Sequence, residues 1–302
     1  MNLLNLIRWK NLLMIAVVQL LIKYALFPAF AMDTTLSTFS FVILIISTLC
    51  IAAGGYIIND IYDIETDAIN KPNKVVIGKS ITESTANKLY IAFTFIGVCL
   101  GFYLSNKVGK PPFFGLFVII AASLYVYASY LKQIAVVGNI IVSVLVALSL
   151  LIVGIFELIP AITIENKTAQ STMLEVLTDF AVFAFLINFI REIVKDIQDV
   201  DGDHKAGMQT LPILFGKMRT SKIAMVLTLI TIAIIVYYLV SFLFMHVTVI
   251  LYFLIAVVGP LIYIAIKMFT AENKIHFKHI SFILKLVMIT GMLAMVIYRL
   301  VL

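Results

Sequence analysis

Long runs of apolar residues fill most of this chain, and polar residues gather in the short stretches between them. The apolar runs are continuous and lack the strict alternation of a half-buried strand. Each run is close to the roughly 20 residues that an α-helix needs to cross a bilayer. The pattern predicts nine membrane-spanning helices, at residues 12–31, 38–58, 88–105, 112–131, 134–158, 174–194, 222–244, 247–268 and 280–301.

The composition indicates that the chain lives in a membrane. Of its 302 residues, 63% are hydrophobic and 13% are charged, and the mean hydropathy is +1.11. A water-soluble core cannot bury this much apolar surface, and lipid accepts only helices or closed barrels because backbone groups must be satisfied internally. We therefore predict an all-α integral membrane protein, with residues 1–302 forming a single transmembrane domain.

Basic residues are distributed unevenly between the two sides of the predicted helices. With the N-terminus in the cytosol, the cytosolic side holds all of the 22 Lys and Arg residues except Lys23, Lys107, Lys110, Lys167 and Arg299. This asymmetry predicts a cell (inner) membrane protein with its N-terminus inside and its C-terminus outside. The net charge of +6 then follows mainly from topology, although it also suits anionic lipid head groups or a phosphorylated substrate. We expect the lipid bilayer, and no nucleic acid, as a partner.

The stretch NDIYDIETDAIN, which begins at Asn59, carries a cluster of acidic residues where the second predicted helix ends. Asp60, Asp63 and Asp67 are spaced i, i+3, i+7, so they share one face if the helix continues through them. Carboxylates stacked in this way repel each other. Positive groups should therefore lie beside them, and Lys71 and Lys74 can offset only part of the charge.

The acidic pattern occurs twice. A shift of 136 residues places Asp196, Asp199 and Asp203 of KDIQDVDGD on the three aspartates of the first motif. Four helix starts lie between the two motifs, which predicts two similar four-helix halves, roughly 1–135 and 136–270, and a ninth helix at 280–301. We expect the two acidic helix ends to face each other across a central cavity.

Paired carboxylate clusters beside an apolar cavity favour one kind of chemistry. Mg²⁺ prefers oxygen ligands, is usually held by one or two carboxylates, and completes its shell with water and substrate phosphates. The motifs contain no His or Cys partners of the kind that zinc or redox iron prefers. A diphosphate with a long isoprenoid tail would suit both the metal and the apolar walls.

The two motifs, NDxxDxxxD at Asn59–Asp67 and DxxDxxxD at Asp196–Asp203, resemble those of the UbiA-type intramembrane prenyltransferase superfamily. The resemblance covers nearly the whole chain. It implies a ring of nine helices around a central cavity that opens to lipid, and Mg²⁺-dependent transfer of a prenyl group from its diphosphate to an acceptor. The segment REIVKDIQDVDGDHKAGMQTLP is most similar to the branch that alkylates geranylgeranylglyceryl phosphate, a step of lipid biosynthesis, and geranylgeranyl diphosphate is then the expected donor.

The resemblance also implies roles for individual residues. Magnesium ligands are expected at Asp60, Asp63, Asp67, Asp196, Asp199 and Asp203. In the segment YASYLK, Lys132 would assist the departing diphosphate, and Tyr127 would face the developing allylic cation. Substrate contacts are expected from Asn11, Asn59, Lys71, Lys74, Tyr130, Arg191 and Lys195. Arg is commoner in the family where Lys71 and Lys74 stand, and Lys supplies charge without a bidentate fork.

Several alternatives remain open at the level of the sequence. The acceptor could be an aromatic or quinone precursor, or the same scaffold could act as a terpene cyclase with no acceptor. A secondary transporter also uses intramembrane acids and internal repeats, but it places the acids near the midplane, whereas these lie at one surface. Lys23, inside the first span, is expected to extend toward the outer surface.

Overall fold

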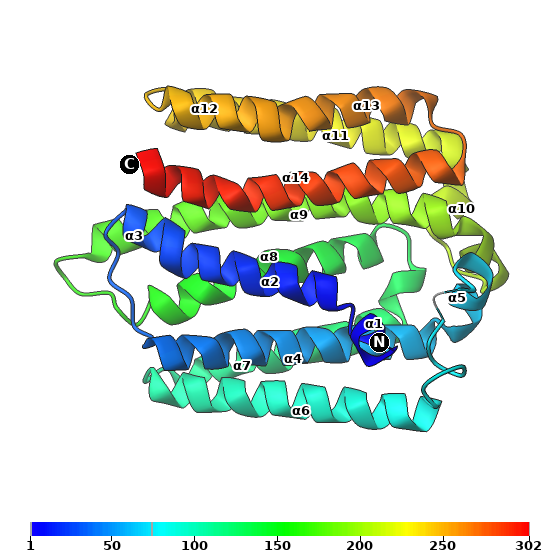
Figure 1. Cartoon of the computed structure of the whole chain (residues 1–302), viewed down its shortest axis with the longest axis horizontal. Helices are drawn as coiled ribbons and strands as arrows, with labels where there is room; N and C mark the ends of the chain where they lie inside the picture. The colour runs from blue at the N-terminus through cyan, green and yellow to red at the C-terminus, as the bar shows by residue number, and fades with distance from the viewer. Residues whose placement is uncertain (1, 74, 302) are drawn as a thin grey trace. The chain divides into compact units, whose positions relative to one another are not determined.

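The computed structural model describes residues 2–73 and 75–301, and helices account for most of them (Figure 1). In chain order they are α1 (Asn2–Leu6), α2 (Trp9–Leu21), η1 (Ile22–Leu26), α3 (Phe27–Ala29), α4 (Thr38–Tyr62), α5 (Ile64–Asn70), α6 (Glu83–Lys107), η2 (Pro111–Phe113), α7 (Phe114–Ser129), η3 (Leu131–Gln133), α8 (Val137–Glu157), α9 (Lys167–Lys205), α10 (Leu211–Phe215), α11 (Lys217–Phe242), α12 (Val247–Phe253), η4 (Leu254–Val258), α13 (Gly259–Thr270) and α14 (Lys274–Val301).

The described residues include nine helical stretches that are long and apolar enough to cross a membrane. Their mean hydropathy lies between 1.6 and 2.7. The predicted number of spans and the all-α membrane class are confirmed. Several helices run beyond the predicted spans, and α9 continues for 39 residues through the second acidic motif.

The chain is divided between two compact units. Unit 1 comprises Met1–Leu20, Met32–Lys132 and Leu148–Leu177, and unit 2 comprises Leu21–Ala31, Gln133–Ala147 and Thr178–Leu302. The first acidic motif therefore belongs to unit 1 and the second to unit 2. The internal repeat of two four-helix halves stays a prediction.

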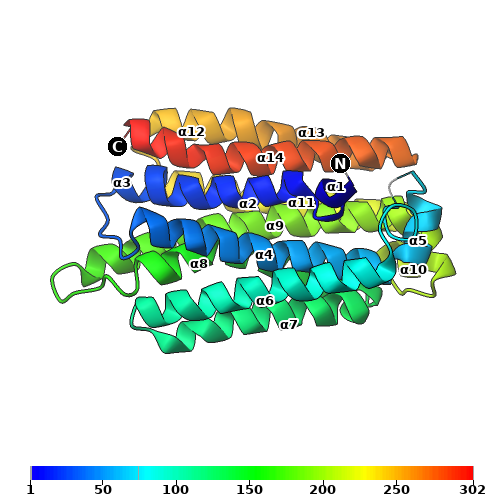
Figure 2. The ribbon, with the colours of Figure 1, turned by 60° about the horizontal axis from the view of Figure 1, so that its bottom comes forward.

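Unit 1 is built around the close contact of α4 with α6, which run side by side in both views, with α7 against them (Figures 1 and 2). A Cβ atom added at Gly97 would lie 2.9 Å from the carbonyl oxygen of Ser47, so only glycine lets the backbones approach this closely. Because the two helices are this close, the Ser47 hydroxyl donates a hydrogen bond to the Gly97 carbonyl at 2.7 Å. Gly55 gives α7 similar access, because a Cβ there would fall 2.7 Å from Leu124.

Buried polar contacts fix unit 1 at the end where α4 begins. The Glu157 carboxylate accepts from the Leu36 backbone N–H at 2.9 Å. Closer to the middle of the helices, the Gln19 amide donates to the Ser149 carbonyl at 3.0 Å. Inside lipid such groups need a protein partner. The first bond ties α8 to the segment before α4, and the second ties α8 to α2. The acidic motif lies at the opposite end of α4.

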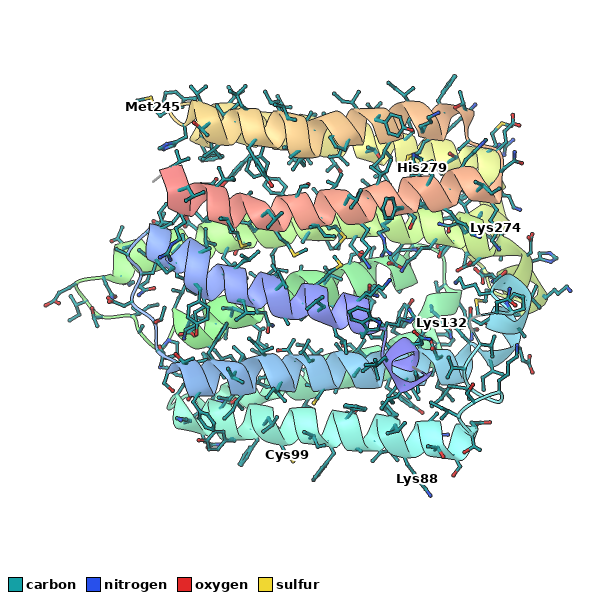
Figure 3. All side chains as sticks on the ribbon, in the orientation of Figure 1. Lys88, Cys99, Lys132, Met245, Lys274 and His279 are labelled. Atoms are coloured by element: carbon teal, nitrogen blue, oxygen red, sulfur yellow. The ribbon has the colours of Figure 1, made fainter. Side chains whose placement is uncertain are left out.

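In unit 2, α13 packs against both α11 and α14, and the turns at Met245 and Lys274 lie at opposite ends (Figure 3). Two wider π-helical turns, η1 and η4, both contact α14. Lys23 lies in η1 and its side chain is buried. The expected extension of Lys23 toward the outer surface is therefore wrong, because the π-turn packs against α14 and the side chain is enclosed by protein.

Candidate functional site

The first acidic motif lies across a break between two helices. α4 ends at Tyr62, Asp63 adopts φ −101° and ψ 7°, and α5 begins at Ile64. The three aspartates would share a helix face only if the helix continued, and it does not. The backbone N–H of Asp67 nevertheless donates to the Asp63 carbonyl at 2.8 Å, so the aspartates remain on successive turns.

Asp63 has the densest set of contacts in this motif. Lys132 Nζ donates to its Oδ1 at 2.5 Å, and the Lys132 side chain is only 8% exposed. Asn59 Nδ2 donates to Oδ2 at 2.6 Å, and Thr66 Oγ1 donates to Oδ1 at 3.2 Å. Lys132 is labelled at the same end of unit 1 as α5 (Figure 3). The sequence analysis singled out Lys132, Asn59 and Asp63, and the structure brings them together.

Asp60 is held by Arg8, a residue that the sequence analysis did not assign to the site. Arg8 Nη2 donates to Asp60 Oδ1 at 2.7 Å, and its guanidinium carbon lies 5.1 Å from the centre of the Tyr56 ring. Arg8 stands between α1 and α2 with φ 50°, a conformation that non-glycine residues seldom adopt. The side chain of Leu6 is buried in a cluster with Ile57, so packing and the ion pair together hold Arg8 there.

Asp67 is the most loosely held of the three. Lys71 Nζ lies 3.8 Å from its Oδ1, and the lysine side chain is 40% exposed. Burial raises the pKa of Asp67 above its ordinary value, and the positive charge of Lys71 offsets part of that rise. Asp67 therefore binds a proton more readily than an exposed aspartate does. Lys74, the other predicted partner, lies outside the described residues. The prediction that positive groups hold the first motif together is confirmed by Arg8, Lys132 and Lys71.

In the second motif the helix does continue. Asp196, Asp199 and Asp203 lie on α9 at i, i+3, i+7 and share one face of it. Asn139 Nδ2, near the start of α8, donates to Asp196 Oδ2 at 2.8 Å. Asn139 is buried, and no sequence pattern singled it out.

Asn139 is part of a buried polar row between α8 and α9. Ser143 Oγ donates to the Asn139 carbonyl at 2.7 Å, and Asn188 Nδ2 donates to Ser143 Oγ at 3.2 Å. Asn139 and Ser143 are four residues apart and therefore lie on the same face of α8. This spacing is the only sequence signal that could have revealed the polar row. It fixes α8 against α9 and thereby the position of Asp196.

The predicted substrate-binding residues of α9 pair with a buried acid. Lys195 Nζ lies 2.7 Å and Arg191 Nη1 3.6 Å from Glu192 Oε1. Tyr127 is half-buried on α7, Asn11 is half-buried on α2, and Tyr130 follows α7 and is exposed. The roles of all five predicted residues stay predictions.

The donor atoms of the motifs decide which metal fits them. Within residues 2–73 and 75–301, no three His, Cys, Asp or Glu side chains converge closely enough to hold an ion by themselves. A closed zinc-type cage is therefore not built from these residues. The motifs offer carboxylate oxygens only, and Mg²⁺ binds through one or two carboxylates while phosphate and water oxygens complete its shell. This donor set fits Mg²⁺ bound together with a diphosphate.

We expect Arg8→Gln to destabilise unit 1 and to weaken the binding of a prenyl diphosphate. The substitution removes the cation beside Asp60, and for a partly exposed pair the loss is about 1 kcal/mol of stability. Thermal unfolding in detergent and the KM for the diphosphate would measure the two effects. Lys10→Gln is the control, because Lys10 is exposed and its ammonium lies over the Trp9 ring rather than beside an acid. If both substitutions changed the unfolding temperature and the KM for the diphosphate equally, a role for Arg8 at the site would be contradicted.

Comparisons with known proteins show the family of the chain. The family model of the UbiA prenyltransferase family matches residues 20–297. The digeranylgeranylglyceryl phosphate synthase of Sulfolobus acidocaldarius is 34% identical over 177 residues, which is 59% of this chain and 58% of the relative. The chain thus spans about three fifths of the length of the curated relatives that it matches.

Solved structures support the fold. One, described as giving structural and mechanistic insights into digeranylgeranylglyceryl phosphate synthase in membranes, superposes with a TM-score of 0.67 at 23% identity, covering 100% of this chain and 98% of the other. A UbiA homolog from Archaeoglobus fulgidus bound to GPP and Mg²⁺ superposes with a TM-score of 0.51 at 17% identity, covering 98% and 99%. Both likenesses confirm the expected class of membrane fold.

Proposed function

Because the chain belongs to the UbiA prenyltransferase family, we propose that it transfers a polyprenyl group from its diphosphate to an acceptor in the membrane. The proposed donor is geranylgeranyl diphosphate and the proposed acceptor is geranylgeranylglyceryl phosphate. The observation that carries the proposal is the first motif, where three aspartates at a helix end are held by Arg8, Lys132 and Lys71. The choice of acceptor is supported by the digeranylgeranylglyceryl phosphate synthases among the relatives.

The proposed chemistry is ionisation of an allylic diphosphate. Mg²⁺ held by Asp60, Asp63, Asp67, Asp196, Asp199 and Asp203 would supply positive charge to the departing diphosphate. Lys132 adds a fixed ammonium group at the first motif, and Asn59 keeps the Asp63 carboxylate in one orientation. The ring of Tyr127 would stabilise the allylic cation by about 1 to 2 kcal/mol in a desolvated site.

The proposed active site faces the cytoplasm. The stretches that carry the motifs also hold most of the Lys and Arg residues, which is the sign of a cytoplasmic side. The N-terminus would then lie in the cytoplasm and the C-terminus outside. Cytoplasmic placement also gives the site access to a water-soluble diphosphate head.

An acceptor screen tests the proposal. Purified protein in lipid nanodiscs would be incubated with labelled geranylgeranyl diphosphate, Mg²⁺ and, in separate reactions, geranylgeranylglyceryl phosphate, an aromatic acid, a quinone precursor or no acceptor. We expect a labelled ether lipid only with the glyceryl phosphate. An adduct with an aromatic or quinone compound would reassign the acceptor, and a hydrocarbon or alcohol formed without acceptor would indicate a cyclase. Absence of all products would contradict the proposed activity.

A further inference from the structure

Unit 2 contains a pocket that the proposed reaction does not use. It has a volume of about 470 Å³ and lies where the end of α9 meets α10 and the start of α11. Its apolar lining residues, which we call the floor, are Val200, Pro212 and Ile213. Its exposed lining residues, which we call the rim, are Asp201, His204, Lys205, Gly216 and Lys217. We call it the α10 pocket.

The α10 pocket lies on a different face of α9 from the second acidic motif. Val200, Asp201, His204 and Lys205 line it, at i, i+1, i+4 and i+5, whereas the motif aspartates follow i, i+3, i+7 from residue 196. Burial separates them as well, because Asp203 is buried while the Asp201 side chain is 68% exposed. The pocket is therefore a separate site and not an extension of the motif.

The rim of the pocket carries a net positive charge. Lys217 Nζ lies 3.4 Å from Asp201 Oδ1, and both side chains are at least half exposed, so water weakens this pair. Asp201 offsets one lysine, and Lys205 remains as a second cation on the same rim. The chemistry of the rim therefore favours an anion.

Exposed apolar side chains adjoin the pocket along the chain. Leu214, Phe215 and Met218 are 53%, 49% and 65% exposed, and they flank the pocket residues Gly216 and Lys217. A short amphipathic segment with exposed Leu, Phe and Met beside lysines is typical of a segment that lies at the membrane surface. A ligand that suits both parts has an anionic head and an oily tail.

We propose that the α10 pocket binds the phosphate ester of a glycerolipid. The head would lie between Lys205 and Lys217, its glycerol stem over Pro212 and Ile213, and its tails would enter the bilayer beside Phe215. Such a phosphate can belong to an anionic bilayer lipid or to a phosphorylated acceptor of the proposed reaction. The recognised group is the same in both cases, and the two sources differ in what they do to turnover.

Lipid binding by the purified full-length protein tests the proposal directly. The double variant Lys205→Gln/Lys217→Gln and the control Lys222→Gln/Lys278→Gln lose the same charge, and the control lysines are exposed and do not line the pocket. Native mass spectrometry would count bound phosphatidic acid against bound phosphatidylcholine. We expect affinity for phosphatidic acid to fall about tenfold in the pocket variant and less than about twofold in the control. Equal losses in the two variants, or none in either, would overturn the proposal.

A variant that binds phosphatidic acid more tightly than the original protein provides a second test, because misfolding would weaken binding and not strengthen it. Asp201→Asn removes the negative charge from the rim and should strengthen phosphatidic acid binding about threefold. Weaker or unchanged binding in this variant would also contradict the proposal.

Kinetics then identify the source of the phosphate. If the acceptor occupies the pocket, the pocket variant raises its KM about tenfold and leaves kcat and the KM for geranylgeranyl diphosphate unchanged. If a bilayer lipid occupies it, the acceptor KM stays constant and the rate no longer depends on the anionic lipid content of the nanodisc. The binding measurement needs no turnover, so failure of the proposed prenyl transfer would leave this inference separately testable.

Discussion

Asp63→Asn is expected to lower kcat by about 100- to 1000-fold. The amide has nearly the shape of the carboxylate but carries no charge, so the proposed magnesium ligand and its electrostatic contribution would be lost together. Asp63 is the informative position because Lys132, Asn59 and Thr66 all contact its carboxylate. Single-turnover rates at saturating diphosphate and Mg²⁺ would measure the effect on the chemical step.

The same substitution leaves the buried Lys132 without its counter-charge, so it also costs stability. Asp63→Asn/Lys132→Met removes both charges and should recover stability without recovering turnover. Glu65→Gln is the matched control, because Glu65 is an exposed acid of the same segment, and it should retain the rate within about twofold. In unit 2, Asp199→Asn should resemble Asp63→Asn. If either aspartate variant kept most of its rate, the assignment of these aspartates as magnesium ligands would be wrong.

The membrane helices could be predicted from the sequence because their signal is local. About 20 consecutive apolar residues have few alternatives to a spanning helix, and all nine predicted spans correspond to helices of the described chain. The break at Asp63 was harder to foresee. Asn59, Asp60 and Asp63 are compatible with a continuous helix or with a cap, and contacts from outside the helix decide between the two.

The residues of other helices that bond to the motif aspartates were also hard to predict, because they are distant in the sequence. Arg8 is 52 positions from Asp60, and Asn139 is 57 positions from Asp196. Periodicity describes one helix at a time and does not say which side chains of another helix will meet it. Lys132 was found only because the family resemblance marks it, since it is 69 positions from Asp63.

The contacts of the first motif also suggest how it accommodates its proposed substrate. Close carboxylates repel, and Arg8, Lys132 and Lys71 compensate that repulsion within the protein. If the aspartates held Mg²⁺ as proposed, the positive charges of these three residues would lie beside the bound diphosphate. Protein cations and metal ions would then act on the same anionic head from different sides.

Removal of Mg²⁺ with EDTA is expected to lower turnover at least about 1000-fold while leaving the fold intact. The metal would supply most of the positive charge that the departing diphosphate needs, and the lysines of the site cannot replace it. Stability should change little, because Arg8, Lys132 and Asn139 already partner the motif carboxylates within the protein. We expect the unfolding midpoint to move by less than about 2 °C. Initial rates against free Mg²⁺ and thermal unfolding of the same sample would measure both effects.

Restoring the metal distinguishes a magnesium site from a general need for cations. Mg²⁺ should recover the full rate, and Mn²⁺ should recover part of it, because both accept carboxylate and phosphate oxygens. Ca²⁺ is larger and takes more ligands, so it should bind without supporting a comparable rate. The polyamine spermidine supplies charge without coordination and should restore nothing. Full turnover in EDTA, or equal recovery with spermidine, would show that the aspartates act without a metal and would remove the basis of the proposed mechanism.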